Sequence, residues 1–330
     1  MSTVNPAQTI IDLTRAYWVS RCLHVAAELG VADALDDEPR RAGELASKMG
    51  LDPDALHRVL RVLVSRGIFT LADGRFSHNE ASRLLRTGTP GSMRAAARTF
   101  GLPVWWNSYG ALEHSLQTGR PAPEPVTGQA LFDYLGAHPD EAGLFAETML
   151  ASSLAQIPSI LEACDFQDAR VIGDIGGGLG HLLAAVLQSN STAEGILFDR
   201  PEVIGKACET PVPRVSYVTG DFFRDRIPAC DVYLLKRVLH DWPDTDAAAI
   251  LTNIRAGATV GARVVLIEGV LDEASPGPLA EVDIEMLVMT GGRERTQEQW
   301  HRLLTDAGMS LRRIVPTSSP MASVIEAVIS

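Results

Sequence analysis

From about residue 169 onward, short apolar runs alternate with helical segments, and this alternation limits the fold more than any other feature of the chain. The apolar runs are ARVIGDIG, GILFD, RVSYVTG, DVYLLK and ARVVLIEG, and the helical segments include GHLLAAVLQS, TDAAAILTNIRAGA and TQEQWHRLLTDAGM. Strands joined by helices lie parallel and are buried on both faces. The pattern predicts an α/β domain over residues 169–330, with ligands bound at the carboxyl ends of its strands.

The first predicted strand runs into a glycine-rich turn, DIGGGLG at residues 174–180, directly before a helix. Glycines let the backbone approach a ligand closely, and a helix N-terminus presents free N–H groups. The spacing of Gly176 and Gly178 departs from the GxGxxG of dinucleotide sites, which disfavours a NAD-dependent oxidoreductase. Asp174 suits a cationic amino group, and Asp199, at the end of the next strand, stands where a carboxylate binds ribose. Together they predict S-adenosylmethionine.

Three later segments also carry chemistry at predicted strand ends. Asp221 and Phe222 follow the third strand, where a carboxylate can accept from the adenine amino group and a ring can stack on it. His240 follows the fourth strand, Glu268 ends the fifth, and Glu294 lies in GGRERT. Carboxylates orient a histidine ring and raise its basicity, so this set predicts a general base. Many histidines are only structural, but the nucleotide-type motif upstream favours catalysis.

The N-terminal part, residues 1–98, has a different organisation. Two short helical segments, with Asp52 as the expected N-cap of the second, precede two extended runs around Asp73-Gly74, which is the layout of a winged helix. A winged helix suggests DNA binding or a ligand-sensing regulator. Residues 1–100 hold 13 Lys+Arg against 11 Asp+Glu, a net charge of only +2. We therefore favour a dimerisation domain over a DNA-binding domain.

Residues 99–168 form a predicted helical linker region that contains a cluster of aromatic side chains. Trp105 and Trp106 belong to this cluster, and the Pro/Gly-rich stretch TGRPAPEPVTGQ interrupts it. Such side chains either pack between domains or wall a pocket for a flat ligand, and these two roles are compatible. We expect this region to contribute to an acceptor pocket.

Overall composition excludes several classes of protein. The chain has 330 residues and a net charge of −12, which argues against a general nucleic-acid binder. The four widely spaced cysteines predict reduced, buried thiols in a cytoplasmic protein. We expect no signal peptide at the N-terminus and no stretch long enough to cross a membrane. No HExxH-type cluster points to a metal site.

The motifs DIGGGLG, LFDRPEV, GDFF, LLKRVLHDWPD, VLIEGV and GGRERT together resemble those of the S-adenosylmethionine-dependent O-methyltransferases of the plant caffeic acid type. They are most similar to the bacterial branch that methylates hydroxyls on aromatic polyketides and related antibiotics. The resemblance covers almost the whole chain. It implies a Rossmann-like class I methyltransferase domain, an N-terminal winged-helix-like, all-helical domain that forms a homodimer, and S-adenosylhomocysteine as the product.

The resemblance also implies roles for individual cofactor residues. Gly176 and Gly178 would line the methionine part of S-adenosylmethionine, and Asp199 would hold the ribose. Asp221 and Phe222 would hold the adenine. Two further cofactor contacts are implied at Lys236 and Ser153.

Around the acceptor, His240 would be the base, Glu268 and Glu294 would bracket it, and Asp241 belongs to the same motif. The family also sandwiches the acceptor between methionines, and we expect an aromatic acceptor lined by Met149, Met286, Met289, Trp105 and Trp106. Gly269 stands where a proline often follows the glutamate of the family, and the segment before GGRERT is one residue shorter. These departures affect the choice of substrate. Some family members do other chemistry, but the intact His240 argues against that here.

Overall fold

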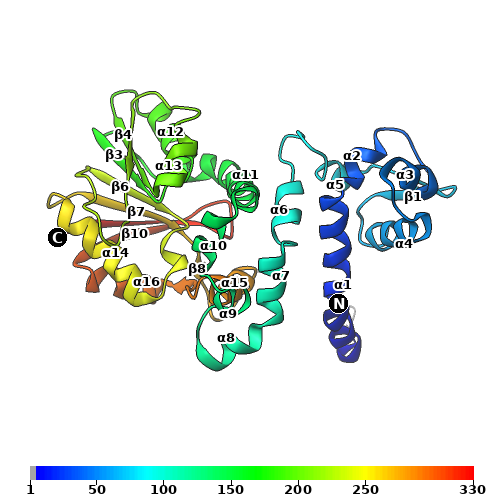
Figure 1. Cartoon of the computed structure of the whole chain (residues 1–330). Coiled ribbons are helices and arrows are strands. Elements are labelled where there is room, and N and C mark those ends of the chain that lie inside the picture. Colours follow the sequence, from blue (N-terminus) through cyan, green and yellow to red (C-terminus); the bar gives the residue numbers. More distant parts are fainter. Residues whose placement is uncertain (1–4) are drawn as a thin grey trace. The chain divides into compact units, whose positions relative to one another are not determined.

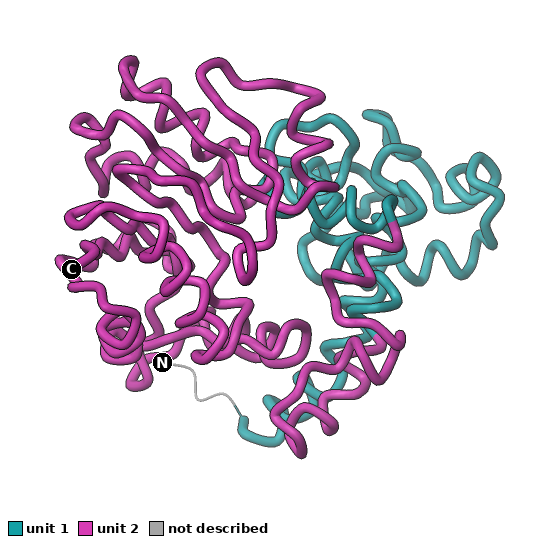
Figure 2. Tube along the Cα trace, turned by 60° about the vertical axis from the view of Figure 1, so that its left-hand side comes forward, with its two compact units in different colours: residues 1–106, 139–151 teal, residues 107–138, 152–330 magenta. Residues whose placement is uncertain are grey.

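The computed structural model describes residues 5–330, which form two compact units that Figure 2 colours separately. Unit 1 comprises the chain up to Trp106 together with Pro139–Ala151, and unit 2 comprises Asn107–His138 and Ser152–Ser330. The predicted linker region 99–168 is thus shared between the two units. The roles that we assign to the ranges 1–98, 99–168 and 169–330 stay predictions. Residues 1–4, part of the stretch in which we expect no signal peptide, lie outside the described residues.

Unit 1 is built mainly from helices and one small hairpin. Its elements are α1 (Pro6–Glu28), α2 (Val31–Leu35), α3 (Ala42–Met49), α4 (Pro53–Val64), β1 (Thr70–Ala72), β2 (Arg75–Ser77), α5 (Glu80–Arg83), α6 (Arg94–Thr99), the start of α7 (Pro103–Gly110) and the first half of α11 (Pro139–Ala163). Helices α3 and α4 and the hairpin follow in the order of a winged helix.

Local sequence signals account for most of these elements. The Asp52 carboxylate accepts the Ala55 N–H at 2.8 Å and caps α4, as predicted. Asp73 and Gly74 both have positive φ, which a tight hairpin turn needs, and they join β1 to β2. The helical apolar spacing of residues 16–35 is divided between two helices, because Gly30, with a φ of 70°, ends α1 and begins α2.

Unit 2 contains a seven-stranded sheet in the order β10-β11-β7-β6-β3-β4-β5 (Figure 1). Its strands are β3 (Val171–Ile175), β4 (Glu194–Asp199), β5 (Val215–Thr219), β6 (Val232–Lys236), β7 (Arg263–Glu268), β10 (Met309–Pro316) and β11 (Ser323–Ile329). Strands β3 to β7 pair in parallel, which confirms the mostly parallel sheet. The antiparallel strands β10 and β11 were not predicted.

Helices cover both faces of this sheet. They are α12 (His181–Ser189), α13 (Pro201–Ala207), α14 (Asp244–Gly257), α16 (Gln297–Asp306) and the second half of α11. The same unit also contains α8 (Leu112–Thr118), α9 (Pro123–Thr127), α10 (Leu131–Ala137) and α15 (Leu279–Met289). Two short strands, β8 (Val270–Leu271) and β9 (Arg295–Thr296), pair beyond the end of β7.

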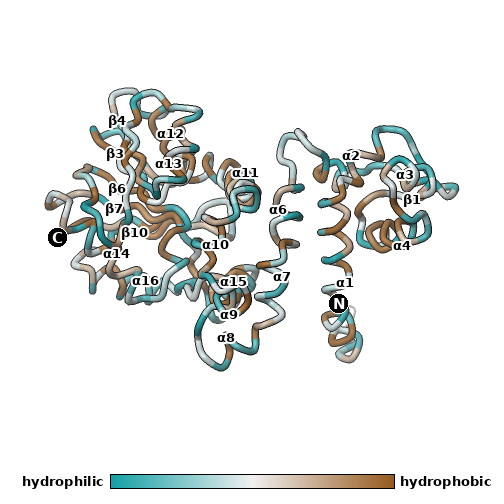
Figure 3. The backbone as a smooth tube through the Cα atoms, viewed as in Figure 1, coloured by the Kyte–Doolittle hydropathy of each residue, from teal (hydrophilic) through white to brown (hydrophobic). Residues whose placement is uncertain are grey.

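Alternation along the central strands builds two hydrophobic cores, one on each face. Leu235 and Leu266 join α14 and α16 in one core, and Leu234 and Val265 join α11, α12 and α13 in the other. Figure 3 shows these central strands among the brown, hydrophobic segments. The two buried faces hold the strands rigidly, so the groups at the strand ends are held in place.

Helix α11 corrects one expectation from the sequence. By length and composition it could cross a membrane, the single such helix in residues 5–330, so the expectation that no stretch is long enough is wrong. The core helices of soluble proteins pass the same test, and 39% of its most apolar window is buried. Ile157 and Ile160, in its second half, pack into the core of unit 2.

The cysteines agree with the sequence analysis only in part. All four are free, and Cys164 and Cys230 are buried as expected. Cys22 is half-buried, and Cys208 is exposed, because it lies at the C-terminal end of α13 outside the core. The expectation of four buried thiols is therefore wrong for Cys208.

Candidate active site

The glycine-rich turn follows β3 and leads into α12, as predicted. Gly176 and Gly178 have φ of 68° and 60°, in the left-handed region that glycine adopts without strain. A Cβ on Gly177 would lie 2.5 Å from Asp174 Cγ, so that position has no room for a side chain. A Cβ on Gly178 would meet nothing within 4 Å, which leaves open space beside the turn.

The carboxylate of Asp199, at the end of β4, joins the turn to the neighbouring strand. Its Oδ2 accepts the Gly178 N–H at 2.8 Å, and its Oδ1 accepts the Arg200 N–H at 2.7 Å. Burial raises the pKa of Asp199, and these two backbone bonds oppose the rise. The structure thus brings together two of the predicted cofactor residues.

Asp174 and Lys236 are ionisable groups at the ends of neighbouring strands. Asp174 is 1% exposed, and its Oδ1 has no hydrogen-bond partner among the residues that the structure describes. Burial raises the pKa of Asp174 to about 7 and lowers that of Lys236 to about 8, and the attraction between the two charges opposes both shifts. An unpartnered buried oxygen is a place where a ligand can donate a hydrogen bond.

Asp221 and Phe222 follow β5 at the same edge of the sheet. The Asp221 carboxylate accepts the Phe223 N–H at 2.9 Å, which shapes the turn. Phe222 packs edge-on against Phe223 at 4.9 Å and against Trp242 at 6.0 Å between ring centroids. Its ring edge lies 3.7 Å from the place where a Cβ of Gly176 would be. Phe222 therefore borders the glycine turn, and its stacking on the adenine stays a prediction.

His240 lies in a 3-10 turn, η1 (Leu239–Asp241), just beyond β6, and its side chain is 4% exposed. Its Nδ1 is 2.8 Å from Glu294 Oε1, and its Nε2 is 3.8 Å from Asp241 Oδ1, too far for a hydrogen bond. Burial lowers the pKa of His240, but the charges of Asp241 and Glu268 and the bond to Glu294 together raise it above its usual range.

The two glutamates act at different places. Glu294 contacts the ring, and its own N–H donates to Asp283 Oδ1 at 2.8 Å. Glu268 makes no hydrogen bond to the ring: its Oε1 accepts the N–H groups of Val238 and Leu239, at 3.0 and 2.9 Å. Glu268 thus holds the start of the turn that carries His240 and acts on the imidazole through its charge.

The predicted acceptor residues fall into different units. Met286 and Met289 are buried in α15 of unit 2. Asp241 is half-buried beside His240, and desolvation raises its pKa to about 6. Ser153 lies half-buried in the part of α11 that belongs to unit 2. Three others belong to unit 1: Met149, which is partly exposed, Trp105, which packs against Phe145, and Trp106, which packs against Tyr17 and His24. The acceptor role of all six residues stays a prediction.

Sequence reasoning missed Arg295 and Asp283. Within GGRERT only Glu294 has a predicted role, because a sequence does not show that an arginine two positions before a helix is fully buried. Arg295 is 0% exposed and bonds the turn that carries His240. Asp283 lies in α15, and no spacing signal marked it.

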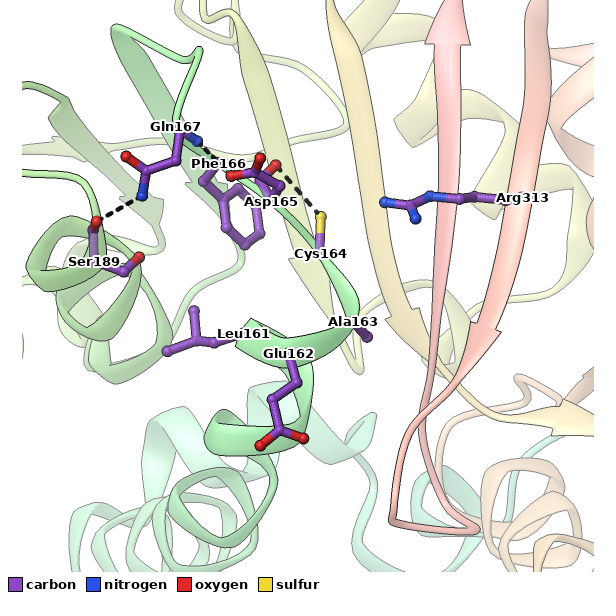
Figure 4. Close-up of a pocket in the computed structure, with 9 residues that line it drawn as sticks. All are labelled: Leu161, Glu162, Ala163, Cys164, Asp165, Phe166, Gln167, Ser189 and Arg313. Atoms are coloured by element: carbon purple, nitrogen blue, oxygen red, sulfur yellow. Dashed lines mark hydrogen bonds between the residues drawn. The ribbon is translucent and has the colours of Figure 1, made fainter.

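A separate pocket of about 300 Å³ lies at the other end of the parallel strands, where these strands begin (Figure 4). It is lined by the end of α11, the Cys164–Gln167 loop, Ser189 and Arg313. This loop borders the beginnings of the strands, since the Asp165 carbonyl accepts from Arg263 at the start of β7. The pocket is therefore separate from the site around His240.

The parallel sheet, the glycine turn and the carboxylates at successive strand ends define a class I methyltransferase, the class whose members use S-adenosylmethionine. More specifically, the chain belongs to the O-methyltransferase family. The family's O-methyltransferase domain matches residues 109–310, and its dimerisation domain matches residues 11–88. The fold class, the family and the methyl donor predicted from the motifs are thereby confirmed.

Known relatives cover nearly the full length of the chain. Phenazine O-methyltransferase PhzM of Lysobacter antibioticus is 37% identical, covering 96% of this chain and 95% of that protein. The 3-amino-4-hydroxybenzoate 4-O-methyltransferase of Streptomyces cremeus is 38% identical, covering 92% and 85%. The O-methyltransferase NcsB1 from neocarzinostatin biosynthesis, solved with S-adenosylmethionine and 2-hydroxy-5-methyl naphthoic acid, has a TM-score of 0.83 at 30% identity, covering 94% of this chain and 96% of that one.

Proposed function

We propose that this O-methyltransferase methylates a hydroxyl of an aromatic small molecule without a metal ion, and that His240 is the general base. The observation that carries the proposal is the buried 2.8 Å contact between His240 Nδ1 and Glu294. We assign the ring proton to Nδ1, which then donates to Glu294 Oε1, and this tautomer leaves the lone pair of Nε2 free. A neutral Nε2 can then take the proton of an acceptor hydroxyl.

The electrostatics around His240 suit this role. Asp241, Glu268 and Glu294 raise its pKa against the effect of burial, so the imidazole is a stronger base than a free histidine. A phenol has a pKa near 10. A more basic partner therefore takes its proton more readily, and general-base help is typically worth about 10²–10⁴-fold in rate.

The residues at the ends of β3, β4 and β5 fit S-adenosylmethionine. Asp174 offers an unpartnered buried oxygen to the amino group, and the Gly178 turn leaves space beside it. Each Asp199 oxygen accepts one N–H and has capacity for a ribose hydroxyl. Asp221 and Phe222 would hold the adenine. When bound, S-adenosylmethionine supplies a methyl group that its sulfonium charge already activates, so the protein's task is to position the acceptor and remove a proton.

Aromatic hydroxyl compounds of bacterial secondary metabolism are the proposed acceptors. The names of the phenazine and aminohydroxybenzoate relatives describe substrates of this kind. A relative at 33% identity, phenazine-1-carboxylate N-methyltransferase of Pseudomonas aeruginosa, makes N-methylation the second candidate. A ring nitrogen attacks with its lone pair and has no proton to lose, which would leave the His240–Glu294 pair without a task. The pair therefore favours a hydroxyl.

We also propose that the enzyme works as a cytoplasmic homodimer. The family's dimerisation domain covers residues 11–88, and α1 within it exposes large apolar side chains, among them Leu13 at 72% and Trp18 at 53%. The four free cysteines agree with a reducing compartment.

Substitution of His240 tests the proposed base. His240→Gln should lower kcat by about 10²–10⁴-fold, because glutamine cannot take the proton, while the affinity for S-adenosylhomocysteine stays at the wild-type value. The matched control is His301→Gln, an exposed histidine on α16 in the same unit. Turnover is followed by mass spectrometry against phenols, naphthoic acids, anthracyclines and aromatic polyketides. Near wild-type kcat in His240→Gln would remove His240 from the mechanism.

A further inference from the structure

Residues Arg293–Arg295 make several hydrogen bonds to the turn that carries His240. The Arg293 N–H donates to the His240 carbonyl at 2.8 Å. The Arg295 side chain donates through Nη1 to the Leu239 carbonyl and through Nη2 to the Trp242 carbonyl, both at 2.8 Å. Glu294, between the two arginines, contacts the imidazole itself. One short segment therefore binds the main chain on both sides of the base and also its ring.

The turn has little else to hold its C-terminal half. Its own backbone bonds are long, 3.2 Å from Asp241 N–H to Val238 O and 3.3 Å from Trp242 N–H to Leu239 O. Glu268 binds only the N–H groups at its start. The two segments lie in direct backbone contact, since a Cβ on Gly292 would fall 2.0 Å from the His240 carbonyl oxygen.

The guanidinium of Arg295 is itself held from three sides. Its Nε donates to Asp244 Oδ1 at 2.8 Å, and the group lies 5.0 Å from the ring centroid of Trp300. Trp300 Nε1 in turn donates to the carbonyl of Gly269, the residue after Glu268. The guanidinium is planar and rigid, and its N–H donors point in fixed directions. One such group can therefore reach both carbonyls of the turn and the Asp244 carboxylate at the same time.

We propose that Arg295 is a positioning residue for the methyl-transfer reaction: by binding the carbonyls on both sides of His240, it keeps the imidazole against Glu294 and its Nε2 directed at the acceptor. This inference rests on the proposed role of His240 as base. Arg295 bonds the turn and not the ring, and it acts on the reaction through the position of that ring.

The test is Arg295→Lys, which keeps the charge but has one nitrogen in place of the fork. A lysine cannot reach both carbonyls and Asp244, so the His240–Glu294 contact should loosen. A displacement of about 1 Å near the chemistry costs roughly 100-fold, so kcat should fall about 10- to 100-fold while the affinity for S-adenosylhomocysteine is unchanged. Because the Glu294 bond raises the pKa of His240, its loss should also move the acidic limb of the kcat–pH profile to lower pH.

Arg302→Lys is the matched control. Arg302 lies on α16 of the same unit, its side chain is 67% exposed, and it pairs with Glu298 on the same helix at 3.1 Å. This variant should keep wild-type kcat and pH profile. Rates are expressed per S-adenosylhomocysteine site counted by calorimetry, so that a fraction of unfolded protein does not lower the apparent kcat.

A separate measurement distinguishes the proposed base, His240, from the proposed positioning residue, Arg295. It is the pKa of the His240 imidazole, followed in protein with ¹³C-labelled histidine, whose signal is assigned with His240→Gln. A lower His240 pKa in Arg295→Lys supports the inference even if His240→Gln proves active, which would overturn only the proposed base. Wild-type kcat and an unchanged His240 pKa in Arg295→Lys would overturn the inference. If Arg295→Lys does not fold, Asp244→Asn takes its place: it should lower kcat several-fold with the same pH shift, and an unchanged profile would refute the inference.

Discussion

Gly269→Ala should impair catalysis although it changes no residue that contacts a substrate. Gly269 follows Glu268, and its backbone lies outside the left-handed region, so alanine fits the main chain. The obstruction is steric, because an added Cβ would lie 2.3 Å from Glu294 Oε2 and 2.7 Å from Leu279 Cδ2. The Leu279 methyl belongs to a flexible side chain, whereas the Glu294 carboxylate is held by His240 on its other oxygen.

The size of the effect follows from these distances. Ordinary contacts of a Cβ begin at 3.4 Å, so the Glu294 carboxylate must withdraw by about 1 Å. Its 2.8 Å bond to His240 Nδ1 would then exceed hydrogen-bond length. A hydrogen bond to a charged group is worth about 1.5–3 kcal/mol, which corresponds to a loss of roughly 10- to 100-fold in kcat. Overpacking adds about 1–3 kcal/mol of destabilisation, visible as a lower Tm.

The assay measures S-adenosylhomocysteine release at saturating donor and acceptor, with active sites counted by calorimetry. Gly205→Ala is the control, since Gly205 lies in helix α13 of the same unit and its added Cβ meets nothing within 4 Å. That variant should keep wild-type kcat and gain about 0.5–1 kcal/mol of stability. A folded Gly269→Ala enzyme with kcat within about twofold of wild type would refute the reasoning that a carboxylate displaced by about 1 Å slows the reaction.

Three further predictions concern pH, the donor and the assembly. The carboxylates around His240 raise its pKa above 6.5, the usual value for a histidine. When kcat is measured from alkaline to acidic pH, it should therefore fall with a midpoint above pH 6.5. A midpoint below pH 6.5 would contradict these electrostatics. Asp199→Ala should weaken S-adenosylhomocysteine binding in calorimetry by roughly 10- to 100-fold, because a hydrogen bond to a charged group contributes about 1.5–3 kcal/mol. Wild-type affinity in this variant would count against the assigned site. Light scattering at micromolar concentration should give a dimer, and a mass near the monomer value of 35.5 kDa would contradict it.

Much of the fold and of the site could be predicted because local signals and the final fold agree. Asp52 caps α4 with its own side chain, and Asp73-Gly74 turns the hairpin, so neither depends on distant residues. The five parallel strands are runs of apolar residues bounded by turns. Since the carboxyl ends of parallel strands lie at one edge, Asp199 and His240 had to lie near the glycine turn.

Other features depend on the folded environment because their local signal is ambiguous or absent. Gly30 permits the positive φ that ends α1, but glycine is also tolerated inside helices and the apolar pattern continues through it, so the sequence alone does not fix the break. Strand β10 carries Arg312 and Arg313 at the edge of the sheet, which obscures the apolar run expected of a strand. Arg313 is accommodated because it pairs with Glu326 on β11 at 2.7 Å.

Arg295 is a residue of the site whose role could not be predicted from the sequence. A buried arginine costs free energy of desolvation unless each of its donors is satisfied. Here the partners are the carbonyls of Leu239, in the 3-10 turn, and of Trp242, directly after it, and both lie more than 50 residues earlier in the chain. Main-chain carbonyls have the same chemistry at every position, so no residue type in that turn signals the pairing. The residue that contacts the imidazole, Glu294, could be predicted from its side chain, whereas the residue that holds the turn could be found only in the folded structure.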